Sequence, residues 1–294
     1  MTLALIAGSG ALPPAILERL PERPLICALA GSAPAVTPDL TFRLERLGGF
    51  LADLTARGVT RICMAGAVAR PEIDPLALDD PTRALLPRLR GALSVGDDGA
   101  LRVVIAIFEE SGFEIVAAHD VAPDLLPDAG VPTAVSPDLA HREDAVLGEL
   151  TLAQMGAADI GQACILRGGH VLAREDAAGT DAMIRRFVPE RGGLWAPADL
   201  LGDALGQAAE WLSGPEGSPV DVRGGILFKG PKPDQDRRVD LPVIGLETAQ
   251  RAVEARLAGI VIEAGGVMVL DLGGVVDTLN RAGAFLWVRP KGGA

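Results

Sequence analysis

The chain has 294 residues, of which 49% are hydrophobic and 22% are charged, and its formal net charge is −12. This length favours two domains, and the apolar content excludes a disordered chain. The negative charge repels nucleic acids and anionic membranes, and aromatic residues, at 3%, are too scarce to form a stacking surface for bases. We therefore expect no nucleic-acid partner.

Short β-branched runs alternate with helical patterns in the first part of the chain. This alternation is typical of a Rossmann-like parallel sheet with helices on both faces. The expected strands are 3–7, 24–29, 61–65 and 114–118, and the expected helices are 11–20, 50–57, 83–93 and 101–111. A segment rich in proline, aspartate and glycine at 122–138 predicts a linker.

The remainder predicts a second, mixed-sheet α/β domain. Gly168 and Gly169 stand between two apolar runs, which indicates a β-hairpin. The expected strands are 162–166, 170–174, 225–229, 259–263, 267–270 and 285–288, and the expected helices are 142–155, 180–187, 247–258 and one before the last strand. Residues 188–220 read as a Gly- and Pro-rich insertion. We expect a nucleotide-side domain at 1–130 and a catalytic domain at 137–294.

Cysteine usage and the N-terminus bear on the compartment. Cys27, Cys63 and Cys164 each lie in an apolar run without a CxxC motif, which predicts buried free thiols in a reducing compartment. The N-terminus has no basic region, and no segment reaches the roughly 18 to 20 uninterrupted apolar residues of a membrane span. These features predict a cytoplasmic protein.

Two loops after predicted strands are candidates for anion binding. Gly8, Ser9 and Gly10 precede a helix, whose N-terminus attracts anions, although a tight turn without a ligand is the alternative. The dinucleotide fingerprint needs a glycine where Pro13 stands, so NAD is disfavoured. Arg70 follows the third strand, where it either binds a phosphate or faces solvent.

Two polar pairs stand at predicted helix starts. Asp97 and Asp98 follow Gly96, and Thr180 and Asp181 follow a glycine as well. Capping the helix is the simpler role of both pairs, and contact with a metal or ligand is the alternative.

The most informative segment is 232–240, in a proline-rich loop after a predicted strand. Phosphoryl chemistry needs cations that offset oxyanion charge and carboxylates that hold a divalent ion or orient water. A solvated, self-neutralising loop is the alternative. The cations are Lys229, Lys232, Arg237 and Arg238, and the interleaved acids are Asp234, Asp236 and Asp240.

Six segments, in this order and spacing, give the chain a family resemblance. They are LALIAGSGALP, GAVARP, VGDDGALR, DIGQACIL, AGTDAMIRR and KPDQDRRVDLPVIG. The chain resembles the bacterial UDP-2,3-diacylglucosamine diphosphatases of the LpxI type from its N-terminus almost to the last strand. The resemblance implies two α/β domains with the substrate between them. It also implies Mg²⁺-dependent hydrolysis in lipid A biosynthesis, in which water attacks the β-phosphorus and releases UMP and 2,3-diacylglucosamine 1-phosphate (lipid X).

The same resemblance implies roles for particular residues. Asp240 matches the family's essential aspartate and would bind Mg²⁺ or orient the attacking water. The pyrophosphate would be lined by Lys232, Gln235 and Arg238. The nucleotide side would be formed by Gly8, Ser9, Gly10, Ala11, Leu12, Ala67, Val68 and Arg70, and the sugar or phosphates would lie near Thr180 and Asp181.

The resemblance further implies an acylated UDP-sugar lipid as substrate. It also implies a homodimer and transient contact with the inner membrane of a Gram-negative bacterium. The insertion at 188–220 departs from the family pattern, so acyl-chain contacts are not carried over to it. An additional glycine within 96–99 is a second departure, which leaves the helix start and any role of Asp97 open. A nucleotide-sugar transferase, which would release UDP, and a non-catalytic nucleotide or lipid carrier are the alternative functions.

Overall fold

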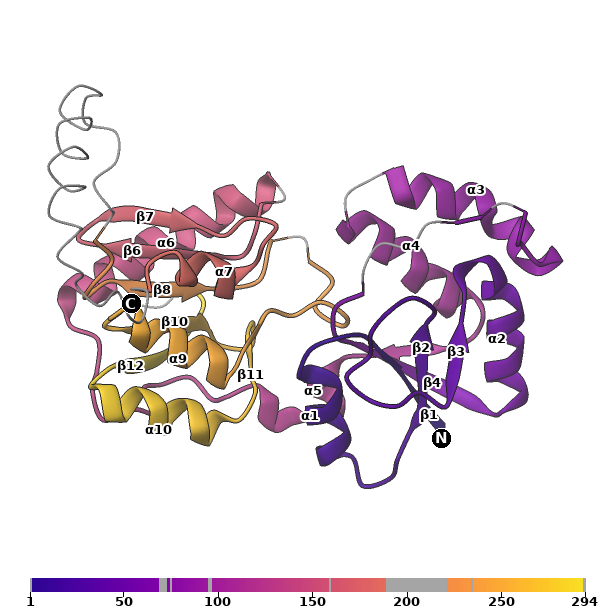
Figure 1. Ribbon diagram of the computed structural model, residues 1–294, viewed down its shortest axis with the longest axis horizontal. Helices are drawn as coiled ribbons and strands as arrows, with labels where there is room; N and C mark the ends of the chain where they lie inside the picture. Colours follow the sequence, from indigo (N-terminus) through magenta and orange to yellow (C-terminus); the bar gives the residue numbers. More distant parts are fainter. Residues whose placement is uncertain are drawn as a thin grey trace, which may run out of the picture.

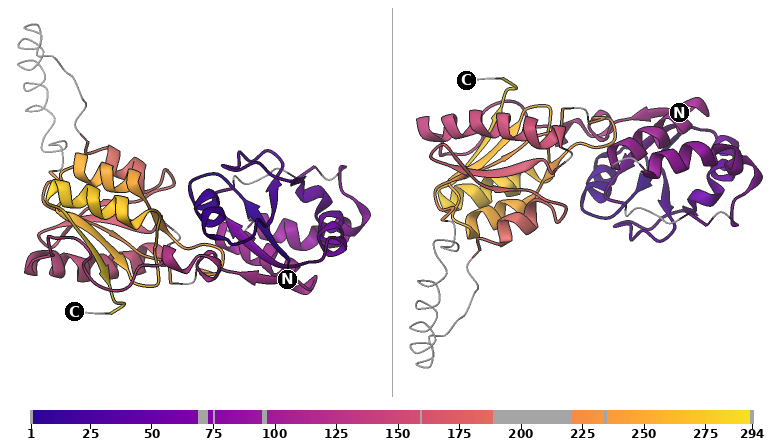
Figure 2. Two further views of the ribbon diagram at one scale, coloured as in Figure 1. Left: turned by 90° about the horizontal axis from the view of Figure 1, so that it is seen from below. Right: turned by 90° about the horizontal axis from the view of Figure 1, so that it is seen from above.

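The computed structural model describes residues 2–68, 73–74, 76–94, 97–158, 160–188, 221–233 and 235–292, without the side chains of 89–94 and 97–98. Within these residues it consists of two α/β halves, each built on its own five-stranded sheet, that lie side by side (Figures 1 and 2). The predicted fold class is confirmed, because the first sheet is parallel and the second is mixed.

The first sheet has the strand order β3-β2-β1-β4-β5. The chain continues from β1 toward β2 on one side of the sheet, and from β4 toward β5 on the other side. In doubly wound sheets, the loops after two such neighbouring strands border the crevice that binds ligands. The strands are β1 (Thr2–Ala7), β2 (Leu25–Leu29), β3 (Leu40–Phe42), β4 (Val59–Ala65) and β5 (Glu114–Val116).

Helices cover both faces of this sheet. Side chains of β1 show why: Ala4 and Ile6 point into one apolar cluster, and Leu5 and Ala7 point into another, because side chains alternate along a strand. The first cluster packs against α2 (Leu47–Ala56), α3 (Asp80–Ser94) and α4 (Asp97–Glu110), and the second against α1 (Leu12–Arg19), α5 (Ala118–Val121) and the short helix η2 (Pro123–Leu125).

The second sheet has the strand order β12-β10-β8-β6-β7. Strands β8, β10 and β12 are parallel, whereas β6 is antiparallel to both neighbours. One face packs against α6 (Leu139–Ala157), and the other against α7 (Thr180–Arg185), α9 (Leu246–Glu254) and α10 (Leu272–Ala282). The strands are β6 (Ala163–Arg167), β7 (His170–Arg174), β8 (Ile226–Lys229), β10 (Gly259–Glu263) and β12 (Phe285–Arg289).

A two-stranded parallel sheet forms the apolar junction between the halves. It pairs β9 (Val243–Ile244) with β11 (Met268–Val269), and Figure 1 shows β11 on the side of the second half that faces the first. Ile244 and Val269 belong to the core of the second half, whereas Val243 and Met268 pack with the core of the first. The alternation of side chains along two short strands therefore connects both cores.

The predicted linker at 122–138 is only in part a linker. Leu125 is fully buried in the core of the first half. Gly130 exchanges two backbone hydrogen bonds with Val288 of β12, at 2.9 and 2.8 Å. The hydroxyl of buried Thr133 accepts a hydrogen bond from another backbone N–H of β12 at 3.0 Å. The segment satisfies polar groups at the edge of the second sheet, so the crossing between the halves is shorter than predicted.

Several short elements were not predicted, among them α5, β3 and β9. The strand expected at 114–118 ends at Val116, and α5 follows it at once. Strands β3 and β9, of three and two residues, are too short to show a hydrophobic period. Of the insertion expected at 188–220, the part from 189 lies outside the described residues.

Candidate active site

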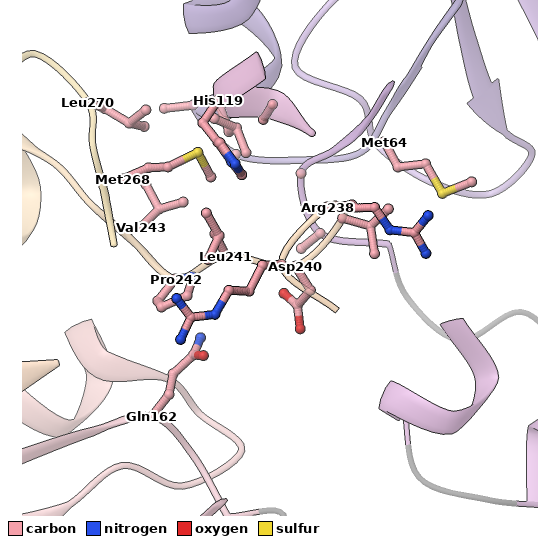
Figure 3. A pocket seen from close by; sticks show the side chains of 18 of the residues that line it. Met64, His119, Gln162, Arg238, Asp240, Leu241, Pro242, Val243, Met268 and Leu270 are labelled. Atoms are coloured by element: carbon pink, nitrogen blue, oxygen red, sulfur yellow. The ribbon is translucent and has the colours of Figure 1, made fainter. Parts of the chain in front are cut away.

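A cavity of about 300 Å³ lies between the two halves, and both contribute to its wall (Figure 3). The first half provides the loops after β1, β4 and β5. The second half provides one residue before β6, the segment that leads into β9, and the residues around β11. The lining residues are Ser9, Gly10, Ala11, Leu12, Met64, Gly66, Ala67, Ala118, His119, Gln162, Arg237, Arg238, Val239, Asp240, Leu241, Pro242, Val243, Met268 and Leu270.

The loops after β1 and β4 are joined backbone to backbone. Ser9 N donates to Ala67 O at 2.8 Å, and Ala67 N donates to Ser9 O at 3.0 Å. A Cβ on Gly8 would lie 2.4 Å from Ala67 O, and a Cβ on Gly66 would lie 2.6 Å from Ser9 O. Glycine is thus needed for this close approach, and the amides of Ser9 and Ala67 are already engaged within the chain.

Helix α1 offers an anion few donors. It begins at Leu12 and continues with Pro13 and Pro14, which have no N–H group. The helix N-termini that bind phosphates do so through such groups. The first half therefore provides shape to this end of the cavity, and most of the positive charge near the cavity comes from the second half.

Asp240 reaches the cavity because its neighbours are apolar. Leu241 is 6% exposed and belongs to the core of the first half, and Val239 packs against the other cluster of that half. Both neighbours point into the first half, so the Asp240 side chain is directed into the cavity, as Figure 3 shows. The run Val239–Leu241 thus fixes a half-buried carboxylate at the junction.

Gln235 holds the Asp240 carboxylate in place. Its Nε2 donates to Asp240 Oδ2 at 2.6 Å and to Gln162 Oε1 at 3.4 Å, and its Oε1 accepts a hydrogen bond from Lys232 N at 3.0 Å. Gln235 is only 8% exposed, so the interaction is sheltered from water. The carboxylate is thereby oriented by a side chain that is itself anchored at both ends.

Two arginines beside Asp240 are paired with carboxylates. Arg237 Nη2 lies 3.0 Å from Glu263 Oε1. Arg238 contacts Asp236 Oδ2 through Nη2 at 2.7 Å and Glu109 Oε1 of α4 through Nη1 at 2.6 Å. The hydrogen bond with Arg238 lowers the pKa of Asp236, and both carboxylates, Asp236 first, raise the pKa of Arg238. Arg238 therefore bridges the two halves as a permanent cation.

A buried polar network lies directly behind the cavity wall. Lys229 Nζ donates to Thr180 Oγ1 at 2.8 Å and to Val243 O at 3.0 Å, and the Thr180 hydroxyl donates to Glu175 Oε1 at 2.8 Å. Glu175 also accepts a hydrogen bond from Gln162 N at 2.6 Å. Burial lowers the pKa of Lys229. The network thus fixes Val243 and Gln162, two residues of the wall.

The expected capping role of Thr180 and Asp181 is wrong. The N-cap of α7 is Gly179, with φ of 87°, and no side chain caps the helix. Thr180 is engaged in the buried network instead, and Asp181 Oδ1 accepts a hydrogen bond from Thr248 Oγ1 at 3.1 Å. The threonine hydroxyl accepts a hydrogen bond from Lys229 and donates one to Glu175 instead of bonding a backbone N–H of the helix.

The predicted site residues divide into three groups. Seven line the cavity, namely Ser9, Gly10, Ala11, Leu12, Ala67, Arg238 and Asp240. Six lie outside its lining, namely Gly8, Val68, Lys232, Gln235, Thr180 and Asp181. Arg70, Asp234 and Gly96, together with the side chains of Asp97 and Asp98, fall outside the described residues. The roles given to these residues stay predictions.

Some residues of the wall had little or no signal in the sequence. Gln162, His119 and Met268 come from three separate segments, and each looks locally like an ordinary core or surface residue. His119 directly follows the predicted strand at 114–118. Position at the carboxyl end of a parallel strand was the one signal available for it.

No three His, Cys, Asp or Glu side chains of the described residues lie close enough together to hold a metal ion. Asp240 is the carboxylate among the lining residues. In the part of the chain that the structure describes, every helix is too short or too polar to cross a membrane.

The fold and cavity define a two-domain α/β protein with a polar site between a parallel-sheet half and a mixed-sheet half. Family models match residues 2–125 as the LpxI N-terminal domain and residues 128–287 as the LpxI C-terminal domain. The chain is 36% identical over 297 residues to the protein named UDP-2,3-diacylglucosamine pyrophosphatase LpxI of Caulobacter vibrioides (strain ATCC 19089 / CIP 103742 / CB 15), covering 97% of this chain and 96% of that protein. The chain belongs to the LpxI family.

Proposed function

We propose that this protein hydrolyses the pyrophosphate bond of UDP-2,3-diacylglucosamine and releases UMP and 2,3-diacylglucosamine 1-phosphate, a step of lipid A biosynthesis. The name of the Caulobacter relative supports the substrate. The observation that carries the proposal is the position of Asp240, which lies in a cavity between the halves next to Arg237 and Arg238. A diphosphate in this cavity would meet positive charge and a carboxylate together.

Each group of the site has a defined role in the proposed reaction. A water oxygen bonds to the β-phosphorus, the bond from that phosphorus to the bridging oxygen breaks, and UMP leaves with the electron pair. Asp240 orients the water and accepts its proton. Gln235 holds the Asp240 carboxylate in position through a hydrogen bond of 2.6 Å. Arg237 and Arg238 offset the charge that grows on the phosphate oxygens. Lys232 is a third cation of the same loop, and its backbone N–H bonds Gln235.

The donors present fit a magnesium ion that is bound together with the substrate. Mg²⁺ is typically held by one or two carboxylates plus substrate phosphate oxygens, so a single carboxylate on the wall is sufficient. Asp240 is the residue that would hold it. When bound, the ion would supply further positive charge to the diphosphate. Removal of divalent ions with EDTA should abolish turnover, and added Mg²⁺ should restore it.

The acyl chains of the proposed substrate extend the proposal to the membrane. A cavity of about 300 Å³ is at the small end of ligand pockets, so it suits the nucleotide and diphosphate and leaves the acyl chains outside. We propose that the protein works in the cytoplasm and meets its substrate at the inner-membrane surface, as a homodimer.

The test is a product analysis with purified protein, UDP-2,3-diacylglucosamine and Mg²⁺ in H₂¹⁸O. We expect UMP and 2,3-diacylglucosamine 1-phosphate, with the label in the latter, because water attacks the β-phosphorus. Release of UDP would indicate a transferase, an intact ligand would indicate a carrier, and label in UMP would place the attack on the α-phosphorus. Each of these results contradicts the proposal as stated.

The Asp240→Ala variant tests the residue that carries the proposal. We expect it to bind substrate with an affinity close to that of the wild type but to lose at least about 10³-fold in kcat, because the group that orients the water is gone. Asp53→Ala is the matched control, since Asp53 lies on the surface of α2 and pairs with Arg57. An Asp240→Ala variant with wild-type kcat would exclude this residue from the reaction.

A further inference from the structure

His119 lies on the cavity wall just after β5, the third of three neighbouring parallel strands whose carboxyl ends border the cavity. Strands β1, β4 and β5 are successive in the first sheet, and the cavity is lined after each of them. His119 follows β5, in the first turn of α5. Figure 3 shows its ring directed into the cavity, on the side opposite Gln162 and Asp240. A side chain in this position is placed to contact a bound ligand.

Neither ring nitrogen of His119 has a hydrogen-bond partner among the described residues. Nδ1 is fully covered and unpaired, and Nε2 lies 4.0 Å from Asp120 Oδ1, which is too far for a hydrogen bond. The side chain is only 27% exposed. Because the protein covers Nδ1, Nε2 is the ring nitrogen that a ligand in the cavity can reach, and polar groups in such sheltered positions nearly always have a partner.

Another histidine of the same chain shows the usual arrangement. The ring of His141 accepts a hydrogen bond from Asp138 N at 3.4 Å through Nδ1, and its Nε2 lies 3.3 Å from Gly224 O. It also packs edge to face against Phe285. His141 is thus satisfied by the protein alone, whereas His119 is not.

The surroundings of His119 indicate which part of a ligand would fit. The apolar side chains of Met268 and Leu270 line the cavity near His119, whereas Asp240, Arg238 and Gln162 lie across from it (Figure 3). Leu12 and Ala118 are further apolar residues of the lining. Binding sites for planar organic groups combine apolar walls with a few polar atoms that fix orientation. A pyrimidine base has apolar faces and a hydrogen-bonding edge, and an imidazole can both donate to such an edge and accept from it.

We infer that His119 binds the nucleoside end of the substrate through a hydrogen bond between its ring and the pyrimidine base. This inference rests on the proposed function, since it places the diphosphate beside Asp240 and the base on the opposite, apolar side. His119 is then a specificity-determining residue and has no part in bond cleavage.

The experiment measures binding of each product separately by calorimetry, with the full chain. For His119→Ala we expect the Kd of UMP to rise at least tenfold and the Kd of 2,3-diacylglucosamine 1-phosphate to stay within twofold of the wild type. His119→Gln, which retains an amide donor and acceptor, should restore part of the UMP affinity. His170→Ala is the matched control, because His170 is exposed at the start of β7. In turnover, His119→Ala should raise KM and leave kcat unchanged.

The outcomes separate this inference from the proposed function. UMP binding needs no turnover, so wild-type protein that binds UMP through His119 but leaves UDP-2,3-diacylglucosamine intact would contradict only the proposed hydrolysis. Unchanged UMP affinity in His119→Ala, or a loss confined to the lipid product, would overturn the role of His119. Thermal unfolding of each variant identifies a folding defect, in which case His119→Gln decides alone. A partial loss of UMP affinity that spares the lipid product then supports the role, and an equal loss for both products, or no loss, overturns it.

Discussion

Gln235 determines how the Asp240 carboxylate is presented to the cavity. Its amide bonds Asp240 Oδ2 at 2.6 Å and is anchored by Lys232 N and Gln162. Gln235→Leu removes these bonds and with them one of the contacts that orient the carboxylate. We expect kcat to fall about 10- to 100-fold, the usual effect of losing a hydrogen-bond partner that orients a metal-binding side chain. KM should change little. Steady-state UMP release measures both constants.

The Gln235→Glu variant separates orientation from simple packing. It places a second carboxylate beside Asp240, and like charges at this distance raise the pKa of one of the pair. The acidic limb of the kcat–pH profile should therefore move to higher pH, which a structural defect would not produce. Gln250→Leu, on the exposed surface of α9, is the matched control. Full turnover by Gln235→Leu would show that Asp240 needs no such support.

At the level of elements, helix α4 forms an ion pair with the loop at 232–240 through Glu109. Glu109 pairs with Arg238, whereas its neighbour Glu110 pairs with Arg88. A diphosphate must compete with Glu109 for the Arg238 guanidinium. Glu109→Gln should therefore lower KM by up to about fivefold, the range expected for a partly exposed ion pair, and leave kcat unchanged.

Glu110→Gln is the control for this prediction, because it removes the same charge from the same helix without touching Arg238. Both variants are compared over a range of salt concentrations, since screening should reduce the advantage of Glu109→Gln. A higher KM for Glu109→Gln would mean that the bridge between α4 and the loop assists binding instead of opposing it.

The same elements show how far a sequence can be interpreted. Strand β1 and the hairpin at Gly168 were predictable because a period of two and a glycine pair are local signals. The charged loop at 232–240 was predictable from its cations in an acidic chain. The partner of Arg238, Glu109, lies 129 residues away, and Gln162 and His119 reach the cavity only through tertiary packing. No local pattern encodes such contacts.

At the scale of the whole molecule, the apolar side chains that join the two halves come from one short stretch of loop and two short strands. Each half has its own core, and the junction consists mainly of Leu241 and of side chains from β9 and β11. Halves joined in this way usually move and unfold separately. The cysteines report on this directly, because Cys27 and Cys63 lie in the two clusters of the first half and Cys164 lies in a cluster of the second.

Thiol labelling in increasing urea tests the separation. Burial raises the pKa of all three thiols to about 12, so none should react with Ellman's reagent in the native protein at pH 8. We expect Cys27 and Cys63 to become reactive together and Cys164 to become reactive in a distinct step, and mass spectrometry of the labelled peptides measures each of them.

The stability of the halves should also depend on pH, because the thiols of the unfolded chain lose their protons near pH 9.0, below the pKa that they have in the folded protein. The folded state therefore binds more protons between pH 9 and 12, and raising the pH through this window should lower the urea midpoints. A single step for all three cysteines would show that the junction couples the halves.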